Sequence, residues 1–571
     1  MLPIDIVIWM RTTLDNLRPL PKRRVGFHQP IGWWSLLALV LAFAVALPVL
    51  VVLGSVLLPK GDVIGHLADT VLLGYIVNTL LLTIGVAIGV TMIGVGTAWL
   101  VTMCRFPGKN LFEWALLLPF AVPTYIIGYT YTDLLQFAGP LQSSLRELTG
   151  WTRHDYWFPE IRSLGGAVIV MSMVLYPYVY LLSRAAFLSQ SSCLLDVSRT
   201  LGRNPWRHFI GVAVPMARPA IVGGAALAIM ETMADFGMVQ HFGISTFTTG
   251  IYRTWFALGE PIAAAQLAAM LMIFVLSMLW IERISRAKAR YDHTTAMRPL
   301  TTYHLTTGRG LLAAGACLAP IALGFAFPVL ALLQMTIEQG DLSMAGKFLP
   351  LAWNSFSLAA LAALLTAGFA LLISYGVRLQ PSAFMKAASS IAALGYAIPG
   401  TVIAVGVLIP FARFDNVLSG WLEDSFGLST GLLLSGTIIG LLFAYLVRFL
   451  AVALNSVDAG FGKINRHLDD AARSLGQRPG GMLCKVHLPL LKSALLTSVV
   501  IVFVDVLKEL PATLIMRPFN FETLAVRVYQ FASDERLAEA STAALAIVVV
   551  GLLPVILLSR AIAASRPRAV E

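Results

Sequence analysis

The sequence predicts an all-α membrane protein with about twelve transmembrane helices, arranged as two parallel repeats of a six-helix unit. Of the 571 residues, 58% are apolar and only 12% are charged, whereas a soluble protein has about 45–50% apolar and about 25% charged residues. Long apolar stretches recur along the whole chain, and short patterns recur about 276 residues apart. These observations exclude a soluble multidomain protein, a disordered chain and a disulfide scaffold.

A helix needs about 20 largely apolar residues to cross the hydrocarbon core of a bilayer. Several of the apolar stretches are longer than that, which predicts tilt or an extra turn outside the bilayer. We do not expect the first 32 residues to be a cleaved signal, since no small-residue cleavage site follows the next apolar run. The predicted spans are 33–58, 71–103, 111–137, 164–187, 219–240, 262–284, 310–337, 352–377, 383–412, 430–454, 493–516 and 538–562.

The net charge of +11 comes from 41 Lys and Arg against 30 Asp and Glu. In a membrane protein, Lys and Arg accumulate in cytoplasmic loops. If the N-terminus is cytoplasmic, 30 of the 41 lie in inward segments, including 184–218 and 448–492, whereas 10 lie in outward loops and Lys508 lies within a span. We therefore expect both termini in the cytoplasm of a bacterial inner membrane, and no nucleic-acid partner.

The two halves of the chain repeat each other. Asn78 and Asn354 open the second and eighth spans 276 residues apart, and Pro123 is followed by Pro399 at the same interval. Six is an even number of spans, so both copies have the same orientation, and a parallel repeat suggests a pathway on the axis between them. A larger bundle without a pathway is the alternative. The predicted segments are 1–32 (cytoplasmic), 33–285 (first six-span half), 286–309 (cytoplasmic linker), 310–562 (second six-span half) and 563–571 (cytoplasmic tail).

Two cytoplasmic loops share one pattern, in which an acid precedes a glycine by six residues and a proline follows that glycine by thirteen. This spacing predicts a short helix, a break where glycine permits positive φ, and a second short helix that ends where the next span begins. The loops are either amphipathic helices on the anionic inner leaflet or a docking element for a cytoplasmic partner, and two copies favour docking. The residues are Asp196, Gly202 and Pro215 in the first loop and Asp470, Ala471, Ala472, Gly476 and Pro489 in the second.

This pattern resembles the EAA loop of binding-protein-dependent ABC importer permeases, which in that family forms the coupling helices that contact the ATPase subunits. The chain differs from the family pattern by Asp in place of Glu in both loops and by Val-Ser in place of Ala-Ala in the first. The stretches 230–237, 246–253, 508–513 and 517–523 look like the ferric-iron branch of these permeases. The resemblance covers most of residues 70–560 and implies a fused type I importer permease.

Four acids lie within the predicted fifth and eleventh spans. Glu231 and Asp235 are four residues apart and are expected to share a helix face, as are Asp505 and Glu509. Acids inside a membrane generally face an interior or a water-filled cavity, and a hard cation such as Fe³⁺ prefers oxygen ligands. The four acids are therefore a candidate translocation pathway with transient Fe³⁺ contact and no stable metal site. Structural or gating roles remain open, and Lys508 is placed to approach either acid of its helix.

Other features carry weaker predictions. Tyr125, Tyr129 and Tyr131 are iron ligands or, more commonly for this residue type, part of an interfacial aromatic belt. The outward segment 140–163 receives a binding protein or caps the bundle. The four cysteines, Cys104, Cys193, Cys317 and Cys484, are far apart and receive no role.

The sequence contains no GxxxxGK[ST] motif, and Gly460-Phe-Gly-Lys463 lacks its spacing. No catalytic constellation gathers in any loop, so we expect a transport subunit without enzymatic activity or cofactor. The family resemblance implies two ABC ATPase copies, which hold ATP and Mg²⁺, and a soluble binding protein. The most consistent function is import of ferric iron. Alternatives are import of thiamine, a polyamine or another small solute, or transport driven by an ion gradient, in which buried acids relay protons.

Overall fold

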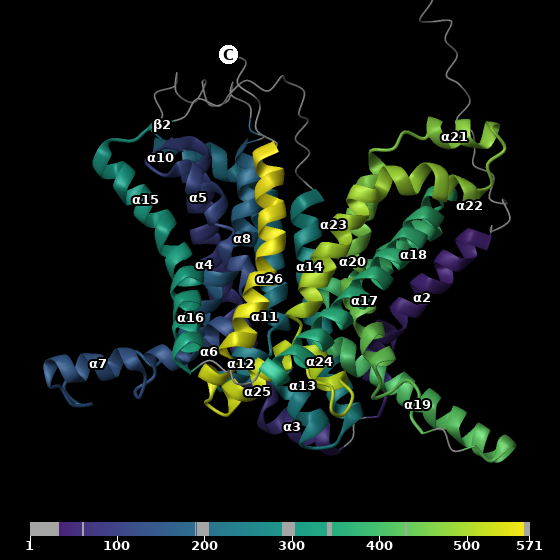
Figure 1. Ribbon diagram of the computed structural model, residues 1–571, viewed down its shortest axis with the longest axis horizontal. Helices are drawn as coiled ribbons and strands as arrows, with labels where there is room; N and C mark the ends of the chain where they lie inside the picture. The colour runs from purple at the N-terminus through teal and green to yellow at the C-terminus, as the bar shows by residue number, and fades with distance from the viewer. Residues whose placement is uncertain are drawn as a thin grey trace, which may run out of the picture.

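The computed structural model describes residues 33–59, 62–188, 190, 205–287, 303–339, 345–428 and 431–564. Within these ranges the chain is almost wholly helical (Figure 1). Eleven helices are long and apolar enough to cross a membrane, and a pair bent by 89°, Lys109–Ala121 and Thr124–Thr149, supplies a twelfth. The predicted fold class and approximate number of spans are confirmed.

The first half consists of long helices with short helices between them. Its elements are α2 (Trp33–Gly54), η1 (Ser55–Leu57), α3 (Asp62–Thr70), α4 (Leu72–Met103), β1 (Cys104–Arg105), α5 (Lys109–Ala115), η2 (Leu118–Ala121), α6 (Thr124–Leu135), α7 (Pro140–Thr149), α8 (Leu164–Leu188), α10 (Pro205–His208), η3 (Phe209–Ala213), α11 (Val214–Ala234), α12 (Gly237–His241), α13 (Phe247–Phe256) and α14 (Pro261–Ala287).

The second half repeats this order from its first span onward. Its elements are β2 (Tyr303–His304), α15 (Thr307–Ile321), η4 (Ala322–Ala326), α16 (Phe327–Gln339), α17 (Ala345–Leu379), α18 (Ala383–Ala392), η6 (Ala393–Ala397), α19 (Gly400–Phe426), α20 (Ile438–Gly462), α21 (His467–Ser474), α22 (Pro479–Met482), η7 (Leu483–His487), α23 (Leu488–Leu507), α24 (Pro511–Met516), α25 (Leu524–Ser533) and α26 (Leu537–Ala564).

Matching hydrogen bonds show that the sequence repeat is also a structural repeat. The side-chain amide of Asn78 donates to the carbonyl oxygen of Ser245 at 3.0 Å, and that of Asn354 donates to the carbonyl oxygen of Glu522 at 3.4 Å. Each bond links α4 or α17 to the segment that precedes α13 or α25. The asparagines therefore have the same structural role in both halves.

The first helix of each half packs against the opposite half. α2 lies against α17, α18 and α19, whereas α15, η4 and α16 lie against α4, α5, α6 and α8. The last helices cross over as well, since α14 packs on α19 and α26 packs on η2 and α6. Each of the two hydrophobic cores therefore contains buried side chains from both halves of the sequence.

The third and ninth spans, predicted as continuous helices over 111–137 and 383–412, are broken. In each, a 3₁₀ turn ends at an extended residue followed by a proline, Val122-Pro123 in η2–α6 and Ile398-Pro399 in η6–α19. The residue before a proline is disfavoured in the α region, so the break is local in origin. Irregular backbone at membrane depth occurs where it is covered by protein or lines a cavity.

The short helices of the two loops lie at one end of the molecule, and α3, α7, α12, α13, α24 and α25 lie at the other (Figure 1). Within the segment 140–163, which is predicted to face outward, α7 projects sideways from the bundle and packs mainly against α6. At the end of this segment, the guanidinium of Arg162 pairs with Glu535 of the second half at 3.2 Å. α7 therefore does not lie across the bundle as a cap, whereas the end of the segment contacts the second half.

Candidate functional site

The second predicted docking loop has the expected helix–break–helix form. Asp470, Ala471 and Ala472 lie on α21, and Gly476 adopts the positive φ of 74° that favours glycine. Pro489 is the second residue of α23, directly after the π-helical turn η7. The second short helix continues into α23 through the π-helical turn η7 and is not separate from the span.

In the first loop, Asp196 and Gly202 lie outside the described residues. Pro215 occupies the first turn of α11, as Pro489 does in α23. The contact of either loop with an ATPase stays a prediction.

The acids of the fifth span do not share a continuous helix face, which corrects the prediction. Glu231 lies in α11, but α11 ends at Ala234 and Asp235 has an extended backbone (ψ 134°). In the eleventh span, Asp505 lies in α23 whereas Glu509 follows its end at Leu507. The chain then forms the short helices α12 and α24, so each half brings one helical acid and one acid at a helix break to the same region.

Asp235 caps the short helix α12 and binds a neighbouring span. Its Oδ1 accepts the backbone N–H groups of Met238 at 3.1 Å and Val239 at 3.2 Å. The hydroxyl of Thr124, at the start of α6, donates to its Oδ2 at 2.5 Å. These bonds satisfy N–H groups that a helix start leaves without partners.

Glu509 has the matching place in the second half but a different partner. Its Oε1 accepts the backbone N–H of Ala512 at 3.0 Å, as a cap of α24. Its Oε2 lies 3.3 Å from the Nε of Arg448 on α20. Glu509 is only 5% exposed and Arg448 only 8%, so the ion pair is shielded from water. Arg448, counted above among cytoplasmic charges, lies inside a span.

The two helical acids have fewer partners. Tyr396 of η6 donates its hydroxyl to Oε1 of Glu231 at 3.1 Å, and Tyr178 of α8 lies near both groups. Asp505 pairs with the ammonium group of Lys508 at 3.1 Å. Lys508 therefore binds Asp505 and not Glu509, its sequence neighbour.

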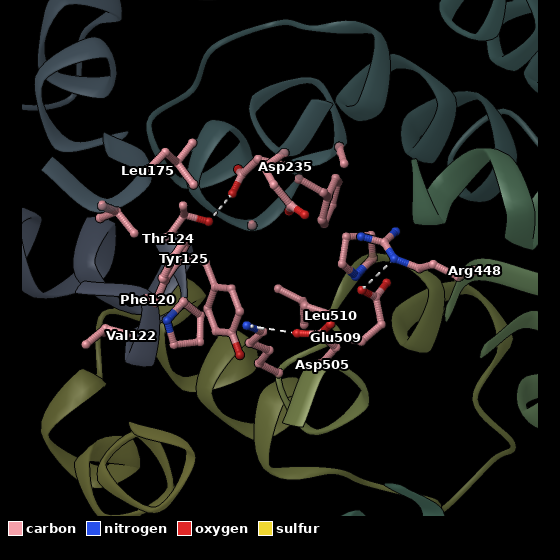
Figure 2. Close-up of a pocket in the computed structure, with 18 of the residues that line it drawn as sticks. Phe120, Val122, Thr124, Tyr125, Leu175, Asp235, Arg448, Asp505, Glu509 and Leu510 are labelled. Atoms are coloured by element: carbon pink, nitrogen blue, oxygen red, sulfur yellow. Dashed lines mark hydrogen bonds and ion pairs between the residues drawn. The ribbon is translucent and has the colours of Figure 1, made fainter. Parts of the chain in front are cut away.

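These groups line one cavity between the two halves (Figure 2). With carboxylates ionised, four acids and two basic residues give the cavity a net charge of −2. Among the described residues, no three His, Cys, Asp or Glu side chains gather as a metal site. The polar lining consists of Thr124, Tyr125, Tyr178, Glu231, Asp235, Tyr396, Arg448, Asp505, Lys508 and Glu509.

The three tyrosines of the third span differ in environment. Tyr125 and Tyr129 are buried, at 5% and 2% exposure, so they do not form a lipid-facing interfacial belt. The hydroxyl of Tyr129 donates to the carbonyl oxygen of Gly237 at 3.2 Å. The hydroxyl of Tyr131 donates to the carbonyl oxygen of Leu323 at 2.7 Å. Only Tyr125 of the three lines the cavity.

Sequence reasoning missed Thr124, Tyr178, Tyr396 and Arg448. The sequence offered a signal for Thr124 and Tyr396, because Thr124 directly follows Pro123 and Tyr396 precedes Pro399 by three residues at the repeated break. Arg448 also had one, since it falls within the apolar stretch 430–454. An arginine inside an apolar span indicates a buried partner or cavity.

The chain was compared with known proteins. Residues 90–291 and 381–570 each match the family described as binding-protein-dependent transport system inner membrane component. The Fe(3+)-transport system permease protein FbpB 2 of Haemophilus influenzae is 26% identical over 93% of this chain and 99% of its own length. The putative ferric transport system permease protein FbpB 1 of the same species is 25% identical over 81% of this chain and 73% of its own length. The molybdenum transport system permease protein ModB of Escherichia coli is 29% identical over 34% of this chain and 87% of its own length. Together with the repeated fold, the two matched regions establish that the chain belongs to this family of inner membrane transport components and carries the family domain twice.

Proposed function

We propose that this chain imports ferric iron as the fused permease of an ATP-driven transporter. One observation carries the proposal: a cavity between the two halves is lined by carboxylate and phenol oxygens, the ligand type that a hard cation prefers. The similarity to an Fe(3+)-transport permease extends over nearly the full length of both chains, which supports the same cargo. The similarity to the molybdenum permease covers about one third of this chain.

The rest of the transporter is proposed from the family and from the loops. Two ATPase subunits, which hold ATP and Mg²⁺, contact the two coupling loops from the cytoplasm. A soluble binding protein delivers cargo at the opposite end, near α7, α13 and α25. Both termini lie in the cytoplasm, as the distribution of Lys and Arg favours. ATP binding brings the loops together and opens the pathway outward, and hydrolysis resets it.

Transport by the purified complex in lipid vesicles tests the proposal. We expect uptake of radiolabelled ferric iron that requires ATP and the binding protein, and that thiamine, polyamines, sulfate and molybdate do not displace. Movement of an organic cation without iron would overturn the assignment of the cargo. Uptake that follows a proton gradient in the absence of ATP would favour a secondary transporter.

A further inference from the structure

The four intramembrane acids divide into two structural classes. Asp235 and Glu509 accept backbone N–H groups from α12 and α24, and each has a further polar partner. Their oxygens are therefore occupied in holding the breaks of the two spans together. Glu231 and Asp505 accept no backbone N–H in the described part of the chain, and both remain partly exposed to the cavity.

Two tyrosines complete a set of oxygen atoms around Glu231. The hydroxyl of Tyr396 donates to Glu231, and Tyr178 lies near both of these groups in the lining of the cavity. These three side chains and Asp505 line the same cavity and are partly exposed to it. They come from α8, α11, η6 and α23, so each half of the chain contributes one acid and one phenol.

Two further observations indicate that this region accepts a ligand. Tyr125 lines the same cavity, and its buried hydroxyl has no hydrogen-bond partner among the described residues, although only 5% of the residue is exposed. A buried polar atom without a partner costs free energy unless a ligand or water satisfies it. In addition, Asp505 is already paired with a cation, the ammonium group of Lys508. The wall of the cavity therefore contains a buried polar atom without a partner and an acid that binds positive charge.

We propose that Tyr178, Glu231, Tyr396 and Asp505 form an all-oxygen binding station for a hard trivalent cation during translocation, while Asp235 and Glu509 act as helix caps. The identity of the cation as ferric iron rests on the proposed function. Carboxylate oxygens suit hard cations, and tyrosine is a known protein ligand of iron. Binding at the station displaces Lys508 from Asp505, so the lysine neutralises the acid between transport cycles.

The test uses the complete complex in detergent, titrated with ferric nitrilotriacetate. Iron bound to tyrosine oxygen has a visible phenolate-to-iron charge-transfer band, which carboxylate-only binding lacks. We expect wild type to develop this band, with weaker binding in Tyr178→Phe and Tyr396→Phe and no band in the double variant. Each single loss should weaken binding by about 10–100-fold, a typical effect of disturbing a metal site. Glu231→Gln should weaken binding similarly without removing a phenol.

Tyr131→Phe is the matched control, because it removes the same hydroxyl from a side chain bonded to Leu323 outside the cavity. Asp235→Asn should keep the band even if stability falls. Size-exclusion profiles identify variants that fail to fold. If the double variant fails to fold, the test is made with the single variants Tyr178→Phe and Tyr396→Phe. The station is overturned if wild type imports iron without the band, or if the double variant keeps it. Absence of iron import by wild type would instead overturn the proposed function.

Discussion

Thr124 and Gly400 are matching residues of the two repeats, each directly after the proline of a broken span. They determine which polar group contacts the capping acid of their half, Asp235 or Glu509. The Thr124 hydroxyl donates to Asp235. A Cβ added at Gly400 would meet the Nη1 of Arg448 and lie 2.6 Å from the Oε1 of Glu509. The missing side chain thus leaves space for the guanidinium of Arg448, so the capping acid accepts from a neutral hydroxyl in the first half and is paired with a cation in the second.

Gly400→Ala is expected to displace Arg448 from Glu509, because the new methyl group occupies the position of the guanidinium. Overpacking of a buried site costs roughly 1–3 kcal/mol of stability, and iron uptake should fall with it. Thermal unfolding of the purified protein and vesicle uptake measure the two effects. Gly368→Ala is the control, since a Cβ there meets no atom within 4 Å. Equal behaviour of both variants would contradict this role of Gly400.

Thr124→Val removes the hydroxyl bonded to Asp235 while keeping a similar shape. A hydrogen bond to a charged group contributes about 1.5–3 kcal/mol, so the variant should unfold at a lower temperature. Thr124→Ser keeps the hydroxyl and should recover most of the loss. If Val and Ser variants unfold at the same temperature, the hydroxyl does not stabilise Asp235.

At the scale of elements, α21, the helix of the second predicted docking loop, is attached to the membrane helices by a buried ion pair. Arg378, at the end of α17, forms two bonds with Asp469 of α21, at 2.8 and 3.0 Å. The same guanidinium donates to the carbonyl oxygens of Phe461 and Ile464. Both charged side chains are 9% exposed. A bidentate pair of this kind fixes orientation as well as distance, so α21 and α17 should move together.

Arg378→Gln is therefore expected to uncouple ATP hydrolysis from transport. Removal of one partner from a buried pair costs roughly 3–5 kcal/mol, which loosens α21 from α17. We expect uptake per ATP hydrolysed to fall several-fold, measured in the same vesicles. The control is Arg536→Gln, whose pair with Glu539 is exposed and worth at most about 1 kcal/mol. A normal transport-to-hydrolysis ratio in Arg378→Gln would refute the coupling role of the pair.

At the scale of the whole molecule, apolar run length and the repeat predicted the number and order of the spans. The acids inside the spans predicted four residues that line the cavity, but not the partners of these acids. The breaks at Pro123 and Pro399 were hidden inside continuous apolar runs. Arg448 was assigned to a loop because its partner, Glu509, is distant in sequence and nothing local pairs them. The crossing of α2 to the second half also could not be predicted, because lipid and helix surfaces are equally apolar and packing detail selects the neighbour.

This crossing leads to a prediction for a divided chain. A cut within 288–302, between α14 and β2, should yield two fragments that assemble when expressed together. α2 and α14 of the first fragment pack on helices of the second, and α15, α16 and α26 of the second pack on the first. Pairing of β1 with β2, in which Cys104 lies opposite Tyr303, adds a further contact.

Co-purification through a tag on one fragment, followed by vesicle uptake, measures assembly and function of the divided chain. A first fragment with residues 33–58 deleted is the control, and it should recover less of the second fragment because α2 no longer contacts α17, α18 and α19. The covalent linker is then dispensable, because the exchanged helices hold the halves together. Fragments that each fold but do not co-purify would show that the exchanged helices contribute too little, and that the single chain is what keeps the two halves around their shared cavity.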